Sequence, residues 1–288
     1  MTQKILTPSP ESATTGRWRS GFSDYLAHVR MFSRNARWYL LGSFLMGMNF
    51  EIFQLLLNLY LKDLDFREGD IGLINACRAM GMALMAIPAS ILFSRFHIRP
   101  LLLSGVVAFA LFSVLLVTTQ QLWLLMGLSL MIGISWSLFR VFGGPFYMSN
   151  STPVERTHLF SCSFAVLLLA GMVGSAGAGK LVTVIGGMAG DMVIGYKLTL
   201  IVGVLIGTLA MFPFAMVTSQ PPISPHTRIS LNLRQLRTRG GFYGKLILVN
   251  FLIGIGAGLI IPFLNLYFKD RFHLAPDMIG LFYLAVSA

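Results

Sequence analysis

Four ionisable side chains stand inside long apolar stretches of the sequence: Glu51, Arg78, Arg140 and Lys180. If these stretches cross a lipid bilayer, inserting each charged side chain near the bilayer centre costs about 2.5–3.5 kcal/mol of free energy. A residue that bears this cost normally faces a water-filled cavity or an oppositely charged partner. The four residues are therefore the first candidates for binding or proton transfer.

Glu51 belongs to a polar stripe on an otherwise apolar segment. The members follow spacings of 4, 4, 3 and 4 residues, which place them on one face of a helix: Ser43, Gly47, Glu51, Gln54 and Asn58. We predict that this face lines a cavity and that Glu51, Gln54 and Asn58, with nearby Asn49, form part of a substrate or proton pathway. The alternative role for Glu51 is a structural ion pair with Arg78 or Arg140.

The three cations admit different roles. Arg140 could bind an anionic substrate, pair with Glu51 or serve helix packing, and the sequence leaves these alternatives open. Arg78 and Lys180 lie nearer the ends of their apolar stretches, where a long side chain can extend its charge to the membrane surface. For these two residues we expect a structural role.

The composition indicates that a bilayer surrounds most of the chain. Of the 288 residues, 55% are hydrophobic and 11% are charged, and the mean hydropathy is +0.73. A helix of about 20 apolar residues spans the hydrocarbon layer, and runs of that length recur. We therefore predict an all-α, polytopic fold with spans at 38–61, 72–94, 99–119, 122–146, 159–186, 194–217 and 245–268, and an eighth from about 279.

The net charge of +11 follows membrane topology rather than a nucleic-acid surface. With the N-terminus inside, the inner segments hold fourteen bases: Lys4, Arg17, Arg19, Arg30, Arg34, Arg37, Arg95, Arg99, Arg156, Arg228, Arg234, Arg237, Arg239 and Lys245. The outer segments hold five: Lys62, Arg67, Lys197, Lys269 and Arg271. Because Lys and Arg concentrate in cytoplasmic loops, we predict a cytoplasmic N-terminus and no nucleic-acid partner.

An internal repeat divides the chain. Leu57, Asn58, Leu59, Tyr60, Lys62 and Asp63 recur 207 positions later as Leu264, Asn265, Leu266, Tyr267, Lys269 and Asp270. Six spans precede the second copy, so both copies begin on the same side of the membrane, as in transporters built from parallel halves. The second copy extends the stripe through Asn265, while the carboxylate at Glu51 occurs in the first copy alone.

The repeat defines four regions. We predict a cytoplasmic tail over residues 1–37, a six-helix bundle over 38–217, a cytoplasmic loop over 218–244 and the start of a second bundle over 245–288. On this interpretation the sequence is truncated within the eighth helix, and the complete form has about 12 spans. In the tail, Phe22, Leu26, Val29 and Phe32 share one helical face, which is typical either of a short interfacial helix or of a flexible basic leader.

The sequence resembles the major facilitator superfamily of transporters at several positions. Its second inter-helix loop aligns with the family pattern G-x-x-x-D-R-x-G-R-R, with Ser90 and Ser94 at the first Gly and the Asp and with Arg95 and Arg99 at basic positions. Four glycines look like the family's glycine-rich fifth helix, where small residues permit close packing: Gly171, Gly174, Gly177 and Gly179. The family's R-x-x-x-G motif of the fourth helix is not matched, since Arg140 lies too near the inner end.

This resemblance implies a multi-pass protein of the cell membrane that moves a small solute by alternating access. Together with Glu51 it favours coupling to protons, and we expect a monomer. The alternative is a non-transporting sensor or scaffold that retains the fold. No motif indicates an enzyme, a cofactor or a metal site, and the solute, the coupling ion and the direction of movement stay undetermined.

Overall fold

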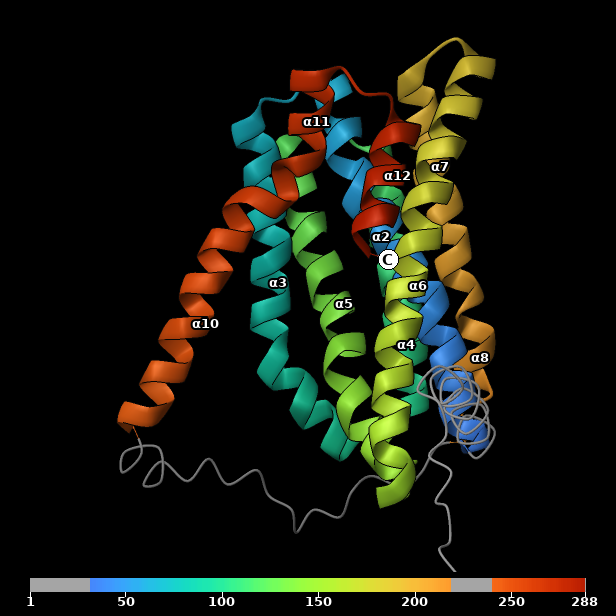
Figure 1. The fold of residues 1–288 in the computed structure, drawn as a ribbon, viewed down its shortest axis with the longest axis vertical. Helices are drawn as coiled ribbons and strands as arrows, with labels where there is room; N and C mark the ends of the chain where they lie inside the picture. Colours follow the sequence, from blue (N-terminus) through green and yellow to red (C-terminus); the bar gives the residue numbers. More distant parts are fainter. Residues whose placement is uncertain (1–31, 219–239, 288) are drawn as a thin grey trace, which may run out of the picture.

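The computed structural model describes residues 32–218 and 240–287 and places helices along almost all of them (Figure 1). The predicted interfacial segment around Phe22, Leu26 and Val29 and most of the predicted loop over 218–244 lie outside these residues. No strand occurs within the described ranges. The prediction of an all-α polytopic fold is therefore confirmed.

The first six spans form one bundle. They are α2 (Arg34–Asp63), α3 (Glu68–Arg95), α4 (Ile98–Thr118), α5 (Leu122–Ser149), α6 (Pro153–Ala189) and α7 (Met192–Leu209), which α8 (Met211–Ala215) extends. A seventh span combines α10 (Gly240–Ile260), the short 3-10 helix η1 (Ile261–Phe263) and α11 (Leu264–Phe272), and α12 (Pro276–Ser287) follows. In the described part of the chain, seven helices are long and apolar enough to cross a membrane.

The helices begin and end where local chemistry dictates. The Ser33 hydroxyl accepts a hydrogen bond from the Ala36 N–H at 3.2 Å and starts α2. Thr152 plays the same part for α6, with Pro153 as the first helical residue. Gly190 ends α6 with a φ of 68°, a left-handed conformation that glycine adopts without steric cost.

The two ends of the bundle carry different charges. One end, here called the basic end, bears Arg34, Arg37, Arg95, Arg99 and Arg156. The other, here called the acidic end, bears Asp63, Glu68, Asp70, Asp191, Asp270 and Asp277. The second copy of the repeat reaches the bundle at the acidic end, where α11 adjoins α2 and α12 runs beside α6, whereas α10 diverges from α3 toward the basic end (Figure 1).

Glycine sets the distance between α3 and α5. A Cβ atom on Gly81 would stand 2.1 Å from the Leu130 carbonyl oxygen, and one on Gly133 would stand 2.0 Å from the Arg78 carbonyl oxygen. Each helix thus presses its backbone against a glycine of the other. Small residues allow this approach in a bilayer, where dispersion contacts rather than water exclusion hold helices together.

We predict that Gly133→Val separates α3 from α5 and lowers stability by about 1–3 kcal/mol, the usual range for overpacking. Thermal unfolding of the detergent-purified protein measures this as a lower melting temperature. Gly127→Val is the matched control, because Gly127 lies on the same helix and a Cβ there would meet nothing within 4 Å. Equal melting temperatures for the two variants would contradict the close packing.

Candidate functional site

The polar stripe of α2 contacts different neighbours along its length. Ser43, nearest the basic end, borders a cavity between α2, α5 and α6. Gly47 and Glu51 lie against α6. Gln54 and Asn58, nearest the acidic end, form hydrogen bonds with α3. The stripe is therefore a continuous polar face inside the protein, running from the cavity to the acidic end.

Glu51 sits where α2, α6 and α12 meet. A Cβ on Gly171 would stand 3.5 Å from Glu51 Cγ, so the missing side chain at Gly171 leaves the carboxyl its space. Tyr283 of α12 is close enough to interact electrostatically with the carboxyl. Within the described ranges Glu51 forms no hydrogen bond or ion pair, so the alternative of a pair with Arg78 or Arg140 is not found in this structure.

Arg78 is held by neutral amide groups. Its guanidinium donates to Gln54 Oε1 at 3.0 Å and to Asn75 Oδ1 at 2.8 Å. Asn75 in turn donates to Asn58 Oδ1 at 2.9 Å. Contrary to the prediction from its position in the sequence, the charge of Arg78 therefore does not reach the membrane surface but is bound in a chain of side chains that joins α3 to the polar stripe.

The repeated asparagines bind each other's helices in the same way. Asn58 donates through Nδ2 to the Pro262 carbonyl oxygen, and Asn265 donates through Nδ2 to the Leu55 carbonyl oxygen, the latter at 2.6 Å. Pro262 lies 207 positions after Leu55, the same shift that relates the two asparagines. Both asparagine side chains are almost fully buried. The two copies therefore make equivalent bonds about a local two-fold relation.

The repeated Lys-Asp pairs continue this pattern at the outer edge of the acidic end. Lys269 forms an ion pair with Asp63, and Lys62 lies 3.8 Å from Asp270 while also pairing with Glu68. Lys269 Nζ also stands 5.3 Å from the centre of the Tyr196 ring, a cation–π distance. We call the set Asn58, Lys62, Asp63, Asn265, Lys269 and Asp270 the reciprocal contact.

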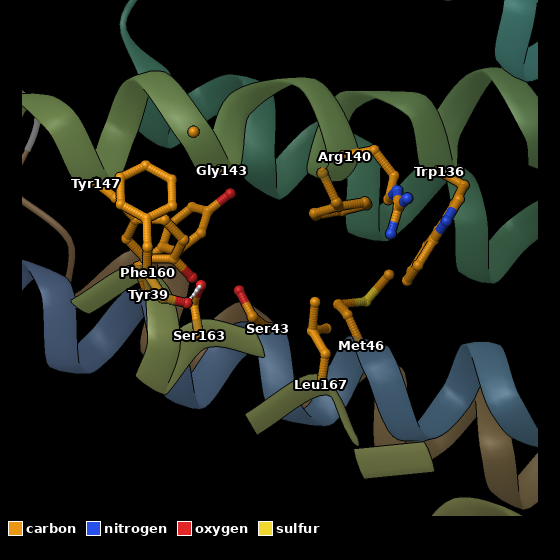
Figure 2. Close-up of a pocket in the computed structure, with 12 residues that line it drawn as sticks. Tyr39, Ser43, Met46, Trp136, Arg140, Gly143, Tyr147, Phe160, Ser163 and Leu167 are labelled. Carbon is orange, nitrogen blue, oxygen red and sulfur yellow. Dashed lines mark hydrogen bonds between the residues drawn. The ribbon is translucent and has the colours of Figure 1, made fainter. Parts of the chain in front are cut away.

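Arg140 lies in a cavity of about 200 Å³ nearer the basic end. Figure 2 shows its guanidinium extending from α5 into the space that faces α2 and α6, beside Trp136 and Met46. No hydrogen bond or ion pair of Arg140 occurs within residues 32–218 and 240–287. The cavity thus contains an uncompensated positive charge.

Aromatic rings and hydroxyl groups form the rest of the cavity wall. Trp136 stacks on Phe50 at a ring distance of 4.3 Å. Nearer the basic end, the phenol oxygen of Tyr147 forms hydrogen bonds with the hydroxyl groups of Ser43 and Ser163. These groups gather at one end of Figure 2. Phe160 packs against Tyr147 at 5.7 Å with its ring nearly perpendicular.

The remaining predicted site residues lie away from this cavity. Asn49 is buried between α2 and α7, and a Cβ on Gly207 would overlap its amide nitrogen at 2.2 Å. Ser90 and Ser94 donate to carbonyl oxygens of their own helix. Arg95 and Arg99 are exposed at the basic end.

The predicted packing glycines divide into two groups. Gly171 and Gly174 face α2, and a Cβ on Gly179 would stand 2.4 Å from the Pro276 carbonyl oxygen at the start of α12. Gly177 faces open space. Three of the four glycines therefore lie at helix contacts, two of them toward the first copy of the repeat and one toward the second.

Sequence reasoning missed three groups of residues at the site. It left out Asn75, the ion-pairing role of the repeated Lys-Asp motif, and four residues of the cavity wall: Tyr39, Tyr147, Phe160 and Ser163. For the Lys-Asp motif a signal was present, because Lys62-Asp63 and Lys269-Asp270 place opposite charges at equivalent helix ends. Tyr147 and Phe160 gave no such signal, since they are ordinary members of apolar helices.

One six-helix bundle followed by the start of a parallel copy, with a polar face and a cavity inside it, matches the plan of secondary transporters built from parallel halves. The family model of the Major Facilitator Superfamily matches residues 39–288. Because that match covers most of the chain, the protein belongs to this superfamily. No sequence among curated proteins matches it.

Solved structures show the same fold at low sequence identity. A bacterial homologue of the human lysosomal transporter Spinster, in an inward-facing and unoccupied conformation, matches with a TM-score of 0.72 and 15% identity. A D-xylose–proton symporter matches with a TM-score of 0.61 and 14% identity. These matches cover 87% and 91% of this chain but 58% and 66% of the respective structures, so the chain spans about three-fifths of their length.

Proposed function

We propose that the protein is a secondary active transporter that moves a small solute by alternating access, with protons coupled through Glu51. The reciprocal contact carries this proposal. It joins equivalent points of the two copies at the acidic end, while α10 diverges from α3 toward the basic end and a cavity lies nearer that end. A structure closed at one end and divergent at the other is one of the two states that alternating access requires.

The charge asymmetry assigns the two ends. The segments that are rich in Lys and Arg lie at the basic end. The positive-inside rule therefore favours a cytoplasmic basic end. The acidic end then faces outward, and the state is inward-facing. The same rule supports a cytoplasmic N-terminus, and the proposed location is the cell membrane.

The reciprocal contact has a strength suited to a reversible closure. Partly exposed ion pairs contribute about 0.2–1 kcal/mol each, and a hydrogen bond between amide groups contributes about 0.5–1.5 kcal/mol. The sum is on the order of a few kcal/mol, which is the usual difference between two interconverting protein states. Such a contact favours the closed acidic end without preventing its opening.

Glu51 lies where a change between the two states of the transporter would alter its surroundings. It lies eight residues beyond Ser43, about 12 Å deeper along α2 at 1.5 Å per residue. Its carboxyl faces α6 and Tyr283 of α12, so its surroundings include both copies of the repeat. Movement of one copy against the other changes these surroundings and therefore the affinity of the carboxyl for a proton, which is the physical basis of coupling.

We predict that Lys269→Ala opens the acidic end more often. In the full-length protein with its native cysteines replaced by serine, a reporter cysteine at the buried Leu266 should react with a maleimide about two- to fivefold faster, the factor that corresponds to one exposed ion pair. The exchanged pair Asp63→Lys with Lys269→Asp should restore slow labelling.

Lys197→Ala controls for the loss of a lysine at the same end, since no ion pair of Lys197 occurs in the described residues. Labelling that stays slow in Lys269→Ala would show that the reciprocal contact does not hold the acidic end closed. Labelling that stays fast in the exchanged pair would show that charge complementarity is not the cause.

We also predict that Glu51→Gln uncouples transport from protons. In proteoliposomes that contain the full-length protein, accumulation driven by a pH gradient should fall at least tenfold, while exchange of solute across the membrane without a gradient continues. Glu155→Gln is the control, because Glu155 lies in the first turn of α6 at the basic end. Unchanged gradient-driven accumulation in Glu51→Gln would show that Glu51 does not couple transport to protons.

The second candidate function is a non-transporting sensor or scaffold that retains the fold. The loop between α3 and α4 favours it, because Ser94 replaces the acidic residue of the family pattern. Absence of flux in proteoliposomes for a panel of sugars, amines, carboxylates and lipid-like anions would support this function over transport.

A further inference from the structure

The cavity around Arg140 has a single formal charge and five aromatic residues in its wall. Its twelve wall residues include Arg140 and no acidic residue. The other polar groups of the wall are the indole N–H of Trp136 and the hydroxyl groups of Tyr39, Ser43, Tyr147 and Ser163. A positive charge next to neutral donors attracts an anion and disfavours a cation.

The wall separates the polar and apolar contacts that a ligand would make. Arg140, Trp136 and Met46 lie toward one end of the cavity, while the hydroxyl groups of Ser43, Tyr147 and Ser163 gather toward the other (Figure 2). The volume of about 200 Å³ exceeds the roughly 150 Å³ of an apolar cavity known to hold benzene. One aromatic ring or an aliphatic group of similar size therefore fits against Trp136.

We propose that this cavity is the binding site of an organic anion that combines one carboxylate-like group with a compact apolar body. Arg140 binds the anionic group, with the planar fork of donors that suits a carboxylate. Trp136 and its neighbours contact the apolar body, and the hydroxyl groups accommodate polar atoms toward the other end. The inference rests on the proposed transport function and narrows its solute to this class.

The location of Glu51 is consistent with this assignment. The carboxyl faces Gly171 of α6 and is not part of the cavity wall. An anion bound to Arg140 therefore does not meet the negative charge directly. A cationic solute, by contrast, would approach Arg140 before it could reach Glu51.

The test compares three probes of nearly equal shape: phenylacetate, phenylethanol and phenylethylammonium. Binding to the full-length purified protein is titrated by saturation-transfer NMR. We expect phenylacetate to bind at least tenfold more tightly than the other two, and Arg140→Gln to remove this preference while phenylethanol binding changes little. Arg140→Lys should keep part of the preference, and Trp136→Ala should weaken phenylacetate and phenylethanol to a similar degree.

Lys180→Gln is the matched control, because Lys180 is another intramembrane cation and lies outside the cavity wall. A native protein that prefers phenylethylammonium or phenylethanol, or an Arg140→Gln variant that retains the preference, would overturn the assignment. A flux assay in proteoliposomes separates the two proposals. Anion-selective binding without flux would support the binding site and contradict transport. Flux that does not depend on Arg140 would support transport and contradict the binding site.

Discussion

The bond between each repeated asparagine and the backbone of the other copy is the interaction on which the arrangement depends. Asn58 and Asn265 are buried, and a buried amide without partners costs about 1–3 kcal/mol. Each is satisfied at its Nδ2 by a carbonyl oxygen at the equivalent position of the opposite copy. A shift of either helix along the other would break both bonds together, so the pair fixes the register at which the copies meet.

Charges are distributed along the bundle axis in a consistent order. The reciprocal ion pairs lie at the acidic end, the bound guanidinium of Arg78 lies just inside it, and Glu51 follows. The guanidinium of Arg140, which has no partner among the described residues, lies nearer the basic end. Arg78 and Arg140 are the same residue type with different surroundings. Amide oxygens of α2 and α3 bind the first, whereas the second faces a cavity.

The sequence could predict the features that depend on local pattern. Apolar length predicts the spans, a regular spacing predicts the polar face of α2, and repetition of Asn, Lys and Asp predicts two parallel copies. The sequence could not show which side chains meet across copies, because that depends on how two helices cross. Asn49 and Asn58 illustrate the limit: both are asparagines of one helix, yet Asn49 faces α7 and Asn58 faces the second copy. The cavity wall was equally hidden, since the ring of Trp136 becomes a wall only after α2, α5 and α6 pack.

The most direct test of the account measures both ends of the full-length protein by pulsed electron spin resonance. One label pair at Arg67 and Arg271 spans the acidic end, and another at Arg99 and Gly241 spans the basic end. Weakening the reciprocal contact by Lys269→Ala should lengthen the first distance and shorten the second, because closure at one end accompanies opening at the other. Distances that stay fixed, or that lengthen together at both ends, would contradict alternating access about this contact.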